Sequence, residues 1–176
     1  VGSNRWGHSS NAQENLNLSF KFNFLIHIFG LKKLMSRFEV PVYLHQEDEI
    51  LLKQATQQAA MFGFKLDLSS VDTIRLDEQK DFIFEEFKFT TLFTPGHAPG
   101  HLSFYFPEQH WVIAGDTLFA GSIGRTDLYK GDLKILEKSI REKLYTLPEV
   151  TKVYSGHGPL TTIKRERISN PYVRPV

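Results

Sequence analysis

Three short segments of the sequence each place a potential metal ligand directly after a glycine. The ligands are His97, Asp116 and His157, and the segments read TPGHAPGH (94–101), AGDT (114–117) and SGHG (155–158). Imidazole and carboxylate groups are suitable ligands for zinc, iron or manganese. Glycine permits the sharp turns that follow strands and lets the backbone come close to an ion. Each segment alone is more typical of an ordinary turn, but the three together predict a metal site.

The elements that position these side chains are predicted from hydrophobic periodicity and turn residues. We expect strands over 40–44, 81–84, 87–93, 101–106, 110–114 and 152–154, and helices over 46–62, 132–144 and 162–169. Each ligand segment follows one of these strands, so the three side chains can meet at one edge of a sheet. Strands on either side of Pro107 should pair antiparallel, and the mixture of strands and helices predicts an α/β layered domain with a mixed sheet.

The bulk properties fit one globular domain. The chain has 176 residues, a net charge of +1 and no cysteine, which excludes disulfides and thiolate ligands. Residues 1–23 are rich in Asn and Ser, and we interpret them as a disordered or foreign head before a domain over 24–176. The near-neutral charge gives no reason to expect nucleic acid or an anionic membrane as partner, and no apolar run reaches the roughly 20 residues of a membrane helix. We expect a cytoplasmic protein, and the sequence leaves its oligomeric state open.

The motifs also resemble those of a known family. TPGHAPGH, the GD pair at 115–116, the GRTD segment at 124–127 and the GHGP segment at 156–159 are similar to motifs of the metallo-β-lactamase superfamily. The branch that they resemble is that of the hydroxyacylglutathione hydrolases, which are glyoxalase II-like enzymes. The similarity covers about residues 38–174 and includes the tail Asn170-Pro171-Tyr172.

This resemblance implies an αββα sandwich with two zinc ions at one edge, with iron or manganese as alternatives. His97 would bind the first ion, His157 the second, and Asp116 would bridge both and act in catalysis. The implied activity is hydrolysis of a small thioester, such as a hydroxyacyl-glutathione, by a metal-bound hydroxide.

The sequence departs from the family upstream of residue 40. The family motif THxHxDH supplies ligands to both ions, and this chain has no such motif. If His27 matches the final histidine, Phe22 and Phe24 stand where histidines belong and Ile26 stands where the aspartate belongs. His27 then remains as a candidate ligand of the second ion, and we expect the N-terminal part of the fold to be incomplete. We hypothesise a broken reading frame or a truncated gene, which translating the coding DNA in its other two frames tests.

Two other functions remain open at this point. Related proteins of the same fold oxidise persulfides with one iron ion, and oxygen consumption with glutathione persulfide distinguishes them. The other possibility is a metal-poor, truncated relative without enzymatic activity, which elemental analysis of the purified protein distinguishes.

Several neighbouring residues are expected to support the site instead of binding metal. We interpret His101 as a histidine behind the ligands, and Arg125 and Asp127 as a pair within their loop. His45 is expected to be a surface or strand-end histidine. The phenylalanines that alternate along 82–93 are expected to belong to the core.

Overall fold

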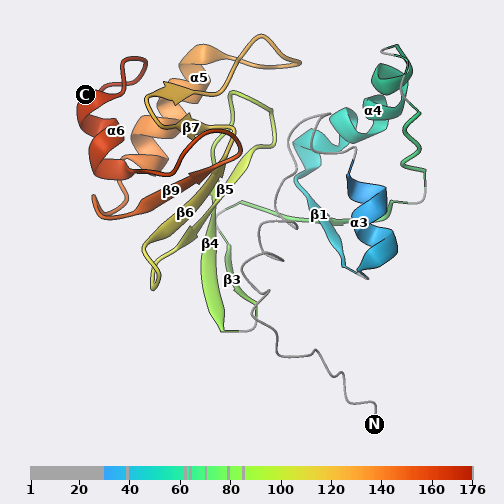
Figure 1. The fold of residues 1–176 in the computed structure, drawn as a ribbon, viewed down its shortest axis with the longest axis horizontal. Coiled ribbons are helices and arrows are strands. Elements are labelled where there is room, and N and C mark those ends of the chain that lie inside the picture. The colour runs from blue at the N-terminus through green and yellow to red at the C-terminus, as the bar shows by residue number, and fades with distance from the viewer. Residues whose placement is uncertain are drawn as a thin grey trace.

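The computed structural model describes residues 30–175, except residues 39, 62, 64, 70, 79 and 85. Its centre is a six-stranded mixed sheet in the order β10-β9-β6-β5-β4-β3 (Figure 1). These strands are β3 (Asp81–Phe84), β4 (Phe87–Phe93), β5 (Leu102–Phe106), β6 (Trp111–Gly115), β9 (Lys152–Ser155) and β10 (Thr161–Thr162).

The pairing of these strands brings three strand ends to the same edge of the sheet. β4 and β6 each pair antiparallel with β5 and therefore run in the same direction. β9 pairs parallel with β6, with Gly115 opposite Ser155. The C-terminal ends of β4, β6 and β9 consequently lie at one edge, and a candidate ligand follows each of them.

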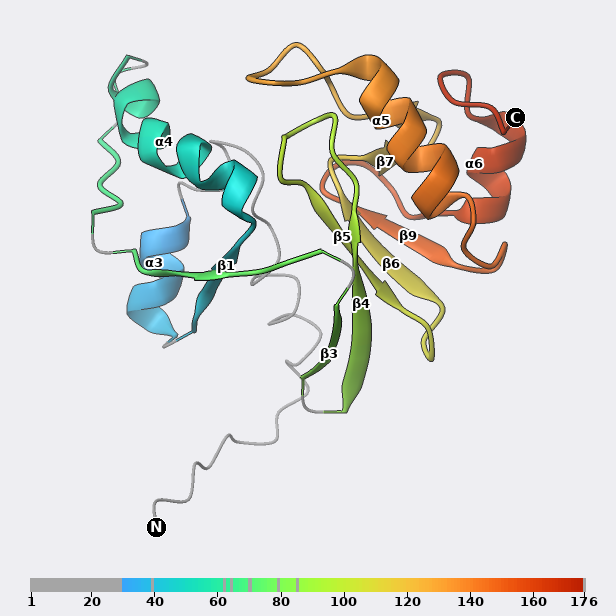
Figure 2. The same ribbon diagram turned by 180° about the vertical axis from the view of Figure 1, so that it is seen from behind.

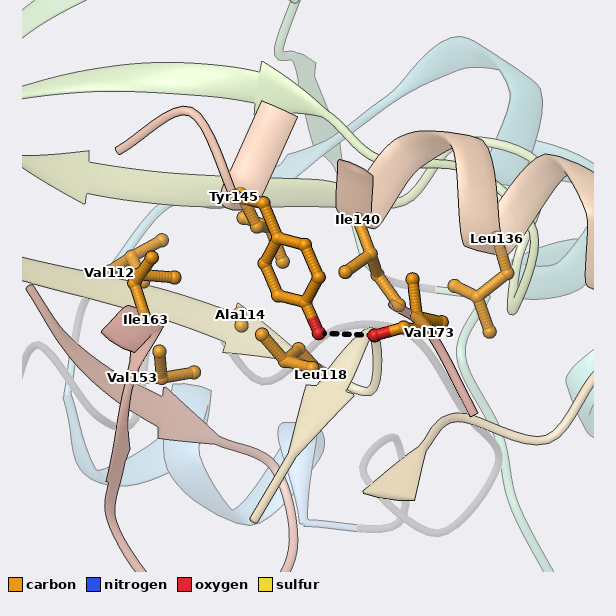
Figure 3. Packing of buried hydrophobic residues seen from close by; sticks show 10 residues of the cluster. Val112, Ala114, Leu118, Leu136, Ile140, Tyr145, Val153, Ile163 and Val173 are labelled. Atoms are coloured by element: carbon orange, nitrogen blue, oxygen red, sulfur yellow. Dashed lines mark hydrogen bonds between the residues drawn. The ribbon is translucent and has the colours of Figure 1, made fainter. Parts of the chain in front are cut away.

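One face of the sheet packs against the C-terminal helices. α5 (Leu133–Ser139), its π-helical continuation (Ile140–Leu144) and α6 (Ile163–Ser169) lie over this face. Figure 3 shows the resulting core, in which Leu136 and Ile140 pack against Val112 and Ala114 of β6. The hydroxyl of Tyr145 in this core donates to the carbonyl of Val173 at 2.9 Å, so this buried hydroxyl has a hydrogen-bond partner.

The opposite face of the sheet is lined by aromatic side chains. Phe89, Phe104 and Phe106 are buried there, and Phe104 and Phe106 lie on the same face because side chains alternate along a strand. Four further elements lie on this side, as both views show (Figures 1 and 2). They are α3 (Leu31–Arg37), β1 (Val42–Leu44), α4 (Glu49–Met61) and β2 (Thr73–Arg75), with β1 and β2 forming a parallel pair.

The predicted fold class is confirmed. Helices cover the outer sides of a six-stranded mixed sheet and of the two-stranded sheet, as expected for an αββα arrangement. Residues 1–29, which include the predicted head and His27, lie outside the described residues, so the predicted boundary at residue 24 stays a prediction. Across the described part of the chain, no helix combines the length and the apolar character that crossing a membrane requires.

Candidate metal centre

The three sequence-predicted ligands meet at the strand-end edge of the six-stranded sheet. The Nε2 atom of His97 lies 3.6 Å from Oδ2 of Asp116, and the Nε2 atom of His157 lies 3.5 Å from the same oxygen. His97 and Asp116 are buried, whereas the side chain of His157 is 55% exposed. The site is thus closed on the His97 side and open to solvent at His157.

The loop that carries His97 is held by helix α5. Gly96 has φ of +125°, and a Cβ atom there would lie 2.4 Å from the backbone nitrogen of Leu136. The Gly96 carbonyl accepts from the backbone N–H of Asp132 at 2.9 Å, and the Pro95 carbonyl accepts from the hydroxyl of Ser139 at 2.7 Å. Glycine is required here because the loop touches the first turn of the helix in a conformation that other residues rarely adopt.

A backbone carbonyl sets the orientation of the His97 ring. Nδ1 of His97 lies 2.9 Å from the carbonyl oxygen of Arg125, which can only accept, so Nδ1 carries the proton. In the neutral ring, Nε2 then presents its lone pair on the side of Asp116. Metal-binding histidines are commonly oriented in this way by a partner on the other ring nitrogen.

The side chains of Arg125 and Asp127 form the predicted pair, with two hydrogen bonds of 2.7 and 2.6 Å. Hydrogen bonding to Arg125 lowers the pKa of the Asp127 carboxyl to about 2. Both side chains are exposed, so the pair shapes the loop and contributes little to stability. The contribution of Arg125 to the site comes from its carbonyl, which the sequence does not reveal.

His101 lies directly behind the ligands, as predicted. Its Nε2 accepts from the backbone N–H of Asp116 at 3.3 Å, and its Nδ1 lies 2.9 Å from the hydroxyl of Thr94. Complete burial lowers the pKa of His101 to about 3, so the ring is neutral near pH 7. Because protein atoms contact both ring nitrogens, His101 positions Asp116 and is not placed to bind a metal.

The prediction for His45 is wrong in part. His45 does follow strand β1, but it is buried and not on the surface. Its Nδ1 accepts from the backbone N–H of Glu47 at 3.3 Å, and its ring centroid lies 5.1 Å from that of Phe93. This contact with an aromatic residue of β4 comes from tertiary packing, which the local sequence does not encode.

Asp48 connects the first helical turn after β1 to the histidine loop. Its Oδ1 accepts from the backbone N–H of Gly100 at 2.7 Å, and its side chain is buried. The pKa of the Asp48 carboxyl is raised to about 6, because burial and, to a smaller extent, the nearby Glu47 outweigh the lowering effect of the Gly100 hydrogen bond. Asp48 thus holds the loop that carries His97 and His101 with a carboxyl group that takes up a proton at a higher pH than an ordinary aspartate.

This raised pKa predicts a pH-dependent stability effect for Asp48→Asn. A folded-state pKa above the unfolded value means that the carboxyl contributes stability below about pH 4 that is lost as the pH rises through 6. Asparagine stays neutral and keeps an oxygen for Gly100. We expect the free energy of unfolding of the variant to exceed that of the wild type by on the order of 3 kcal/mol at pH 8 and by almost nothing at pH 4.

Urea unfolding at pH 4, 6 and 8 measures this difference. Asp72→Asn, which changes an exposed aspartate, is the matched control and should show no such trend. If the free energies of unfolding of Asp48→Asn and the wild type differ by the same amount at all three pH values, the prediction is contradicted.

The donor set fits a metal ion in its chemistry. Two imidazoles and one carboxylate suit zinc or iron, and two ligands bound at tetrahedral zinc lie about 3.3 Å apart, close to the spacings of 3.5 and 3.6 Å seen here. Within the part of the chain that the structure describes, however, no group of three or more His, Asp or Glu side chains already has the geometry to hold an ion.

Two contacts of the site were not foreseen from the sequence. The ring of Phe119 meets that of His157 edge to face, with centroids 6.2 Å apart. A Cβ atom at Gly156 would lie 2.2 Å from Oδ1 of Asp116, so the backbone of the third loop touches the central carboxylate. The glycine before each ligand pointed to such close approach, but nothing in the sequence indicated the role of Phe119.

Comparison with known proteins finds relatives of this chain in sequence and in structure. The family model described as the metallo-beta-lactamase superfamily matches residues 27–157. The chain is 40% identical over 149 residues to the probable metallo-hydrolase YqgX of Bacillus subtilis, covering 84% of this chain and 70% of the relative. It is 36% identical over 151 residues to the hydroxyacylglutathione hydrolase GloC of Haemophilus influenzae, covering 85% and 71%.

A solved structure shares both fold and sequence. The crystal structure of TTHA1623 in a di-iron-bound form is 38% identical and superposes with a TM-score of 0.74. The match covers 84% of this chain and 72% of that one.

Proposed function

Because this chain belongs to the metallo-beta-lactamase superfamily, we propose that it is a metal-dependent hydrolase of thioesters of the hydroxyacyl-glutathione class. The observation that carries the proposal is the meeting of His97, Asp116 and His157 around one carboxylate oxygen. The 36% identity to a hydroxyacylglutathione hydrolase supports the substrate class. The similarity to a probable metallo-hydrolase and to a hydroxyacylglutathione hydrolase favours hydrolysis over the two other possibilities, which are persulfide oxidation and a protein without enzymatic activity.

In this proposal, His97 would hold the first metal ion, His157 the second, and Asp116 would serve both. The metal is zinc or iron, and when bound it supplies Lewis-acid activation of the acyl carbonyl and of a water molecule. His27 stays a predicted ligand because it lies outside the described residues.

The chain's own groups prepare the site for this chemistry. The Arg125 carbonyl keeps the proton of His97 on Nδ1, and the neutral His101 accepts the backbone N–H of Asp116. Both buried ligands are therefore fixed before a metal arrives, which reduces the reorganisation that binding requires. The exposed side of His157, next to Phe119, is the side from which a small thioester can enter.

The proposal is tested with the full chain after incubation with zinc or with ferrous iron under anaerobic conditions. We expect the chain to hydrolyse a hydroxyacyl-glutathione thioester, which is measured as a loss of thioester absorbance. A chelator should abolish this hydrolysis, and added metal should restore it. No hydrolysis with either metal, or oxygen consumption with glutathione persulfide instead, contradicts it.

A further inference from the structure

A buried polar cluster joins the last helix to the hairpin beside the metal site. Glu166 of α6 is fully buried, and its Oε2 accepts from the backbone N–H of Gly121 at 2.8 Å and from Nδ2 of Asn170 at 2.9 Å. Its Oε1 accepts from the hydroxyl of Thr161. Gly121 lies in the turn between β7 (Leu118–Phe119) and β8 (Ser122–Ile123), so one carboxylate connects α6 to this hairpin.

Asn170 provides a second connection to the same turn. Its Nδ2 also donates to the carbonyl of Ser122 at 3.0 Å, and its Oδ1 accepts from the backbone N–H of Tyr172 at 3.0 Å. The tip of the hairpin is thus held through a backbone N–H at Gly121 and a backbone carbonyl at Ser122. Both anchors come from buried side chains of the C-terminal segment.

The hairpin that is anchored in this way is linked to each of the three candidate ligands, either directly or through the residues that flank it. Asp116 lies two residues before β7, and the ring of Phe119 in β7 meets the ring of His157. At the other end, the carbonyl of Arg125, two residues after β8, orients Nδ1 of His97. A shift of the hairpin would consequently reach all three ligands.

We propose that Glu166, assisted by Asn170, is a positioning residue that sets the orientation of His97 and the metal affinity of the site through the β7–β8 hairpin. The metal part of this inference rests on the proposed function, and the part on His97 does not. A buried carboxylate is weak evidence for a role in stability, because apolar residues of similar volume often stabilise a core equally well. What Glu166 adds is a fixed acceptor for a backbone N–H of the hairpin.

The test compares Glu166→Gln with Thr161→Val. A glutamine keeps the size of Glu166 but loses its negative charge, so the hydrogen bond from the backbone N–H of Gly121 becomes a weaker one between neutral groups. Thr161→Val is the matched control, because it also removes a hydrogen bond to the Glu166 carboxylate. The bond that it removes is to Oε1, whereas the hairpin is held by Oε2. A role in stability alone would make the two variants alike.

Two readouts on the full, metal-free chain report the position of the hairpin. For Glu166→Gln we expect the Gly121 amide to exchange with solvent about fivefold to tenfold faster relative to the global unfolding rate. We also expect the nitrogen NMR shifts of His97 to move away from the form protonated on Nδ1. Thr161→Val should leave both unchanged.

A third readout uses metal alone as the probe. In cobalt titrations, Glu166→Gln should raise the dissociation constant roughly tenfold, a typical effect of losing an outer-shell partner. If neither variant nor wild type binds cobalt while the His97 shifts still respond to Glu166→Gln, the proposed function fails and the positioning role stands. Equal His97 shifts in Glu166→Gln and Thr161→Val overturn the positioning role.

Asn170→Ala serves as a second variant in case Glu166→Gln does not fold. It removes the contact to the Ser122 carbonyl and should change the His97 shifts in the same direction. Unchanged His97 shifts in a folded Asn170→Ala protein also overturn the proposal.

Discussion

Asp116→Asn should lower kcat/KM for thioester hydrolysis by more than about 100-fold, beyond the 10–100-fold effects typical of outer-shell partners. Oδ2 of Asp116 lies between the Nε2 atoms of His97 and His157, so the substitution removes the only negative charge from the centre of the three donors. The fold should survive, because the hydrogen bond from Asp116 to His101 uses the backbone N–H. Steady-state kinetics of the metal-loaded chain and a thermal melt measure the two effects.

Asp81→Asn is the matched control for this prediction. Asp81 is exposed on β3, at the far edge of the six-stranded sheet, and its substitution makes the same chemical change. It should leave kcat/KM within about twofold of the wild type, as expected for a surface site. If Asp116→Asn retains wild-type turnover, Asp116 is not at the reacting centre.

Gly156→Ala should disable the site without adding or removing any charged group. The new methyl carbon would lie 2.2 Å from Oδ1 of Asp116, so the carboxylate must move away from its position between the two histidines. We expect cobalt affinity to fall at least tenfold, together with a loss of stability in the range of about 1–3 kcal/mol typical of overpacking. Cobalt absorption spectra report the affinity and the coordination geometry together.

Gly30→Ala is the control, because nothing lies within 4 Å of a Cβ atom at that position. Gly124→Ala provides a contrast, since its Cβ would lie 1.8 Å from the backbone oxygen of Asp116. A backbone atom yields less readily than a side chain, so Gly124→Ala should lower stability more than Gly156→Ala does. Unchanged cobalt affinity in Gly156→Ala would falsify the close contact between this glycine and the ligand.

The long strands and the ligand loops could be predicted because their patterns are local. Strand β4 is observed over the predicted range 87–93, and helix α5 begins after Asp132, whose side chain accepts from the backbone N–H of Ile135 as a helix cap. The three ligand segments could be placed at one edge because each follows a strand. Their convergence then depends only on strand direction, which is regular in a sheet.

Strand β2 and the β7–β8 hairpin were not predicted, because their strands have only two or three residues and no apolar periodicity. Strand β2 (Thr73–Arg75) is exposed at all three positions and therefore has no alternation of apolar and polar residues. The hairpin of β7 and β8 has two residues in each strand. The sequence equally gives no sign that Glu166 is buried, because it lies among Lys164, Arg165 and Arg167 and resembles part of a solvated helix face.

The most direct measurement is the metal content of the purified full chain after exposure to zinc or ferrous iron and extensive dialysis. A functioning centre at His97, Asp116 and His157 predicts at least one tightly bound ion per chain in the wild type and in Asp81→Asn, and little or none in Asp116→Asn. A wild-type chain that retains no metal, or an Asp116→Asn chain that retains as much as the wild type, would contradict a metal centre at these residues.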